Sequence, residues 1–132
     1  MKKILCFGDS NTYGFNPSNG SRFSSAVRWT SLLKDSLKNQ FQVIEAGCNN
    51  RTCFSDNPDG IETTGYKILP KYLTKDIDIL VLALGINDLQ KFYCSDENSI
   101  RIGFSKILNI AYSVNKNIKI VVLSHLFYLT IF

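Results

Sequence analysis

Short apolar runs divide this chain into four parts. Each run is rich in branched residues and ends where a glycine or a polar residue begins, as expected of strands buried within a sheet. The predicted strands lie at residues 4–7, 41–46, 77–84 and 118–123.

Between the predicted strands, apolar residues recur every three or four positions, which is the period of a helix with one buried face. This pattern predicts helices over residues 28–37, 68–73 and 100–114. We expect Ser95 or Asp96 to cap the last helix, because both residue types favour that position. Pro70 should sit in the first turn of the middle helix or kink it.

This alternation of strands and helices predicts an α/β fold, a three-layer sandwich whose parallel sheet carries helices on both faces. Right-handed crossovers favour a flavodoxin-like strand order of 2-1-3-4. The 132 residues suit a single domain over residues 1–132. Ligands of such sheets bind beyond the carboxyl ends of the strands, so chemistry is expected directly after Phe7, Ala46, Leu84 and Leu123.

Composition narrows the function classes. Fifteen Lys and Arg against eleven Asp and Glu give a net charge of +4, and their scatter argues against a nucleic-acid surface. The most apolar segment, residues 118–132, is shorter than the roughly 20 residues of a membrane-spanning helix. The apolar run before Gly8 is too short for a secretory signal. We therefore expect a cytoplasmic protein whose cysteines are reduced, buried and not redox centres: Cys6, Cys48, Cys53 and Cys94.

Small polar clusters follow three of the predicted strands, namely GDSNTYG at 8–14, GCNNRT at 47–52 and GIND at 85–88. A serine between a strand and a helix, such as Ser10, presents its hydroxyl to an opening and lies at the positive end of the helix dipole. Backbone N–H groups and an asparagine amide at the same edge can bind a developing oxyanion. The alternative is that Ser10 merely caps a helix and that Asn87 and Asp88 form a turn.

The three clusters resemble the signature blocks of a known family. FGDSNTYG and GIND look like the first and third blocks of the GDSL/SGNH hydrolases, and NNRT resembles the second. The surrounding sequence is closest to the small bacterial arylesterases, and the resemblance extends from Lys2 to about Leu123. It implies a serine esterase that acts on small-molecule acyl esters and needs no metal or organic cofactor.

The resemblance also implies the roles of individual residues. Ser10 is the nucleophile, and the N–H groups of Ser10 and Asn50 form the oxyanion hole together with the Asn87 side chain. Asn50 stands where the family commonly has Gly or Ala, which we expect to narrow the acyl pocket. Asn tolerates the left-handed backbone angles that such a position can require.

Three neighbouring charged residues are supporting candidates: Asp9, Arg51 and Asp88. Asp88 corresponds to a structural neighbour of the site and is left out of the catalytic triad. Arg51 is either part of the second block or a solvated surface charge.

The family's fourth block, Asp-x-x-His, supplies the general base and its orienting acid. Here the single histidine is His125, the residue three positions before it is Val122, and no acidic residue follows Glu97. We therefore expect the chain to stop before this block, the fifth strand to be missing, and esterase activity to be impaired. His125 is interpreted as a strand-end residue. The last predicted strand, around Val121, then becomes an exposed edge that favours homo-oligomers.

Two other function classes fit the same residues. The first is a non-catalytic remnant of the same fold, which binds a ligand or acts through association. The second is a flavodoxin-type binder of phosphate or flavin phosphate, with Ser10, Asn11 and Thr12 at the helix N-terminus around the phosphate. Asp9 at the mouth of this loop disfavours an anion.

Overall fold

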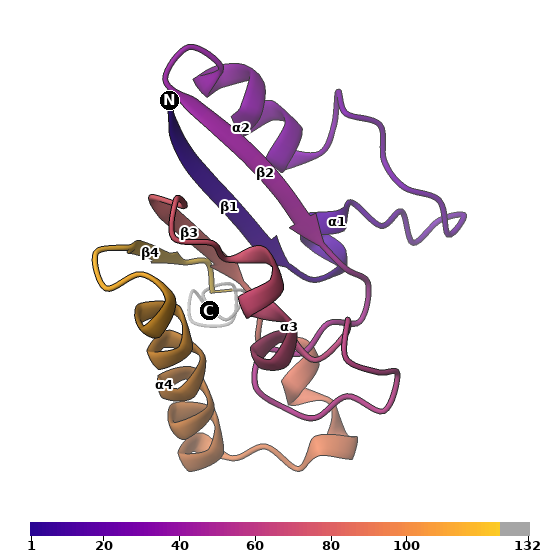
Figure 1. Cartoon of the computed structure of the whole chain (residues 1–132). Coiled ribbons are helices and arrows are strands. Elements are labelled where there is room, and N and C mark those ends of the chain that lie inside the picture. Colours follow the sequence, from indigo (N-terminus) through magenta and orange to yellow (C-terminus); the bar gives the residue numbers. More distant parts are fainter. Residues whose placement is uncertain (125–132) are drawn as a thin grey trace, which may run out of the picture.

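Four parallel strands form the centre of the computed structural model, which describes residues 1–124 (Figure 1). β1 (Lys2–Gly8) pairs with β2 (Phe41–Gly47) on one side and with β3 (Ile79–Ala83) on the other, and β3 also pairs with β4 (Lys119–Val122). The order β2-β1-β3-β4 confirms the predicted topology.

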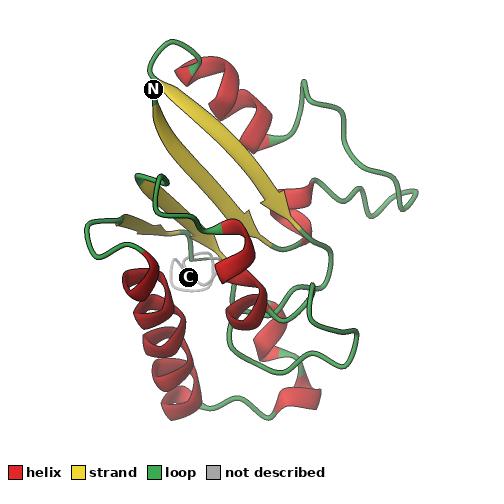
Figure 2. Cartoon of the chain, in the orientation of Figure 1, coloured by secondary structure: helices red, strands yellow, loops and turns green. Residues whose placement is uncertain are grey.

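Helices lie on both faces of this sheet, which confirms the predicted α/β sandwich (Figures 1 and 2). α2 (Trp29–Leu37) covers one face, whereas α3 (Gly65–Tyr72) and α4 (Glu97–Val114) cover the other. Three short pieces lie at the ends of the strands: α1 (Ser10–Tyr13) after β1, then η1 (Asn87–Leu89) and η2 (Lys91–Tyr93) after β3. No helix within residues 1–124 is long and apolar enough to cross a membrane.

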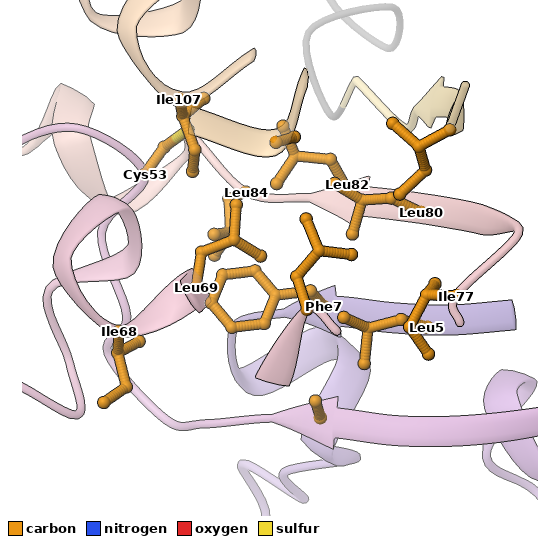
Figure 3. Packing of buried hydrophobic residues seen from close by; sticks show 14 residues of the cluster. Leu5, Phe7, Cys53, Ile68, Leu69, Ile77, Leu80, Leu82, Leu84 and Ile107 are labelled. Atoms are coloured by element: carbon orange, nitrogen blue, oxygen red, sulfur yellow. The ribbon is translucent and has the colours of Figure 1, made fainter. Parts of the chain in front are cut away.

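Alternate residues of β1 enter two separate apolar clusters. Leu5 and Phe7 face the larger cluster, which α3 and α4 complete, whereas Ile4 and Cys6 face the smaller one beneath α2. Figure 3 shows the larger cluster, with Phe7 among leucines of the strands and of α3. Each such side chain stabilises the fold by about 1.5–3 kcal/mol when fully buried. These clusters hold the strand ends, and therefore the loops that follow them, in place.

Contacts between segments decide where the helices begin. Asp96 caps α4, because its carboxylate accepts a hydrogen bond from the Ser99 N–H at 2.7 Å and the Ser99 hydroxyl accepts one from the Asp96 N–H. The predicted first-turn place of Pro70 is wrong. α3 begins at Gly65, whose N–H donates to the Thr52 carbonyl at 2.9 Å, so contact with another loop sets the helix start.

β4 forms one edge of the sheet within residues 1–124. Val121 and Val122 on this strand are 46% and 45% exposed. The strand therefore presents apolar side chains at an edge, as predicted. His125, the apolar residues after it and the expectations attached to them lie outside the described residues.

Candidate active site

The polar clusters predicted from the sequence meet at one edge of the sheet. The arrowheads of β1 and β2 point to this edge in Figure 1, and the parallel β3 ends there too. Ser10, Asn50 and Asn87, one from each cluster, line a single open pocket of about 240 Å³ together with Phe15 and Asn49. Residues far apart in the sequence thus surround the Ser10 side chain.

Two glycines let α1 lie directly against the strand ends. A Cβ at Gly47 would come within 2.1 Å of the Tyr13 nitrogen, and one at Gly8 within 2.0 Å of the Thr12 hydroxyl oxygen. Asp9 caps the helix by accepting a hydrogen bond from the Asn11 N–H at 3.0 Å. Asp9 is thus the cap, so the interpretation of Ser10 as a mere cap is wrong.

Amide donors face the same pocket from two directions. Asn50 has a φ of 62°, the left-handed conformation that asparagine tolerates. Within residues 1–124, neither its N–H nor that of Ser10 has a hydrogen-bond acceptor. The Asn87 Nδ2 donates to the Arg51 carbonyl at 3.0 Å, and an amide nitrogen carries two protons, so one remains. The site therefore holds the three donors that an oxyanion hole requires.

A chain of side-chain hydrogen bonds borders the pocket. The Gln90 amide nitrogen donates to Asn50 Oδ1 at 3.3 Å and to Asn87 Oδ1 at 3.2 Å, and Asn50 Nδ2 donates to Asp59 Oδ2 at 2.6 Å. We call these four residues the rim: Asn50, Asp59, Asn87 and Gln90. The sequence did not reveal Asp59 or Gln90, because no motif links residues that meet only through folding.

Arg51 lies beneath the pocket and is 1% exposed, so its interpretation as a solvated surface charge is wrong. Its guanidinium donates to the Ala46 carbonyl at 2.9 Å and to the Glu62 carbonyl at 2.8 Å. It also lies 4.5 Å from the centre of the Phe7 ring. Arg51 thereby ties the end of β2 to the loop before α3, and burial is tolerated because its donors have partners.

Asp88 is fully buried and binds the loop after β2. Its carboxylate accepts hydrogen bonds from the N–H groups of Cys53 at 2.6 Å, Phe54 at 3.0 Å and Ser55 at 2.8 Å. The Asp88 carbonyl also accepts a hydrogen bond from the Ser95 hydroxyl at 2.6 Å. These contacts fit the predicted structural neighbour of the site.

A second carboxylate, Glu45, holds the loop that carries Phe15. Glu45 accepts hydrogen bonds from the Ser31 hydroxyl at 3.0 Å and from Arg28 at 3.3 Å, and Arg22 lies 3.5 Å away. Burial by itself would raise the pKa of Glu45, but the Ser31 hydrogen bond and the Arg28 charge outweigh it and lower that pKa. No sequence motif marked this cluster, because its members come from different elements.

The four cysteines are free thiols in different surroundings. Cys6 and Cys53 are buried, and burial together with the negative charge of Glu45 raises the pKa of Cys6 to about 12. Burial likewise raises the pKa of Cys53. Cys48 is half-buried and Cys94 is exposed, so the expectation that all four are buried is wrong. Cys94 ends a short 3₁₀ turn at the surface, where no apolar neighbours cover it.

Known proteins share this sequence pattern and architecture. A model of the GDSL-like lipase/acylhydrolase family matches residues 6–131. An aryl esterase from M. smegmatis is 31% identical with a TM-score of 0.79, and the match covers 92% of this chain and 63% of the esterase. Est24, a carbohydrate acetylesterase from Sinorhizobium meliloti, is 27% identical with a TM-score of 0.81 over 92% and 63% of the two chains. The chain thus spans less than two thirds of these structures, and no curated protein matches it significantly.

Proposed function

Because the chain belongs to the GDSL-like lipase/acylhydrolase family, we propose that it is a serine hydrolase of small carboxylic esters, with Ser10 as nucleophile. The observation that carries this proposal is the shared pocket of Ser10, Asn50 and Asn87. The aryl esterase and acetylesterase relatives support an acyl ester as substrate.

In the proposed reaction, Ser10 Oγ bonds to the carbonyl carbon of the ester, and the carbonyl electron pair moves onto its oxygen. This oxyanion accepts hydrogen bonds from the Ser10 and Asn50 N–H groups and from the Asn87 Nδ2. Collapse of the intermediate expels the alcohol and leaves an acyl-serine, which water hydrolyses. Each such donor contributes on the order of 10²–10³ to the rate.

The serine proton needs an acceptor for this step. Residues 1–124 contain no histidine, and His125 lies outside the described part of the chain. We therefore expect slow turnover, with the oxyanion hole and substrate binding retaining about 10³–10⁴ of the acceleration over water. Esters with a good leaving group, such as p-nitrophenyl acetate, should react best because p-nitrophenolate departs without a proton.

Hydrolysis of p-nitrophenyl acetate by the 132-residue chain tests this proposal. Wild-type protein should exceed Ser10→Ala, whereas Ser36→Ala, a change at an exposed serine of α2, should match wild type. Added imidazole can act as the missing base, so it should accelerate wild type more than Ser10→Ala. Equal rates of wild type and Ser10→Ala, with and without imidazole, would support the non-catalytic remnant instead.

We also propose that two copies associate through β4. Its exposed Val121 and Val122 support this, because apolar edge strands pair readily with a second strand. Size-exclusion chromatography at micromolar concentration should show a species larger than a monomer, and Val121→Lys should shift it toward the monomer. A wild-type monomer would overturn the proposal.

A cytoplasmic location remains our proposal, supported by the four free thiols. Thiol titration of protein isolated from its own cells should find all four reduced. A disulfide in that material would contradict it.

A further inference from the structure

Gln90 contacts both residues to which we assign oxyanion donors, yet it does not line the pocket. Its side chain is exposed, and its amide nitrogen reaches Asn50 Oδ1 and Asn87 Oδ1 at 3.3 and 3.2 Å. A residue in this place can act on the reaction only through its two neighbours.

We propose that Gln90 is a positioning residue that decides which end of the Asn87 amide faces Ser10. This inference rests on the function proposed above. Only the nitrogen end of an amide donates hydrogen bonds. Since the Gln90 nitrogen donates, it pairs with the oxygen of Asn87, and the Asn87 nitrogen must lie on the other side.

The Arg51 carbonyl provides the matching restraint. It accepts one proton of Asn87 Nδ2 at 3.0 Å, while Gln90 holds Asn87 Oδ1. With both ends of the amide held, the second Nδ2 proton keeps one direction. Asn87 lines the pocket beside Ser10, so this proton is available to an oxyanion there.

The direction of the whole chain of bonds originates at Asp59. A carboxylate only accepts, so Asp59 takes the Asn50 nitrogen at 2.6 Å and leaves Asn50 Oδ1 for Gln90. Gln90 then presents its nitrogen to both asparagine oxygens. Each donor in the rim has an acceptor only in this arrangement, which makes the Asn87 orientation a property of four side chains.

Substitution of Gln90 separates a contact from its polarity. Gln90→Ala removes the restraint and should lower kcat for p-nitrophenyl acetate about 5–10-fold, roughly one neutral hydrogen bond. Gln90→Glu keeps the size but only accepts, so it draws the Asn87 nitrogen away from Ser10 and should lower kcat about 100-fold. KM and Tm should change little, because Gln90 is exposed and touches no substrate.

A double substitution distinguishes positioning from a structural role. In an Asn87→Ala background, Gln90→Ala should lower kcat by less than about twofold, since the group it positions is gone. A structural role would lower kcat equally in both backgrounds. Equal losses, or a Gln90→Glu enzyme as active as wild type, would overturn the proposal.

A readout without turnover keeps this test separate from the proposed function. The ¹⁵N-edited side-chain amide resonances of Asn87 should shift in Gln90→Glu and stay unchanged in Gln40→Glu, the same change at an exposed position after α2. If the resonances shift but wild type shows no Ser10-dependent hydrolysis, the hydrolase function fails and the positioning stands. If hydrolysis depends on Ser10 and the resonances do not move, the positioning fails.

Discussion

The candidate site has a buried floor and an exposed rim, and the two are held together differently. Arg51 and Asp88, which we call the floor, are 1% and 0% exposed and bond mainly to backbone groups. Gln90, Asp59 and Asn50 of the rim bond side chain to side chain. Loss of a floor residue unpairs buried backbone groups, whereas loss of a rim residue exposes its partners to water. The floor should therefore govern stability and the rim the chemistry.

Asp88→Ala should break the floor most severely. It removes the acceptor of three N–H groups, one of them fully buried, and should lower the free energy of unfolding by about 3–5 kcal/mol. Urea unfolding followed by circular dichroism measures this, with Asp35→Ala on the exposed face of α2 as control. Equal stability of the two variants would show that Asp88 is not a structural anchor.

Arg51→Lys tests whether the geometry or only the charge of the floor matters. Lysine keeps the charge but cannot reach the Ala46 and Glu62 carbonyls together as the guanidinium fork does. We expect a loss of about 2–3 kcal/mol in the same unfolding measurement. A lysine variant as stable as wild type would reduce Arg51 to a point charge.

Glu45 should add a smaller, pH-dependent contribution. A carboxyl group whose pKa is lowered by folding stabilises the protein above its ordinary pKa of 4.5, and this contribution is lost as the pH falls through the lowered value. Tm measured from pH 6 to pH 3 should therefore fall more steeply for wild type than for Glu45→Gln. Parallel curves would mean that Glu45 does not anchor the loop of Phe15 through its charge.

Asn50→Gly should have the smallest effect on stability, less than about 1 kcal/mol. Glycine adopts the observed φ of 62° readily, and the lost Asp59 contact is exposed. Activity should respond instead, since the change removes a side chain from the pocket wall. We expect kcat/KM for p-nitrophenyl butyrate to rise relative to the acetate; an unchanged ratio would place the acyl group elsewhere.

The backbone of the site followed from the sequence, whereas the support of the site did not. Continuous apolar runs identified the strands, and parallel strands bring Ser10, Asn50 and Asn87 to one edge whatever the details of packing. Arg51 gave no sign of burial, because an arginine is buried only where folding supplies partners for its donors. Gln90 lies 40 positions from Asn50, and only the final packing places them in contact.

The most direct test of the claim that Ser10 and the amides of residues 50 and 87 act on one oxyanion is the crystal structure of a phosphonate adduct. A p-nitrophenyl alkylphosphonate transfers its phosphonyl group to a nucleophilic serine and releases p-nitrophenolate. The account predicts a bond from Ser10 Oγ to phosphorus and a phosphonyl oxygen about 2.7–3.1 Å from the Asn50 nitrogen and the Asn87 Nδ2. An adduct on another residue, or an oxygen directed away from Asn87, would contradict it.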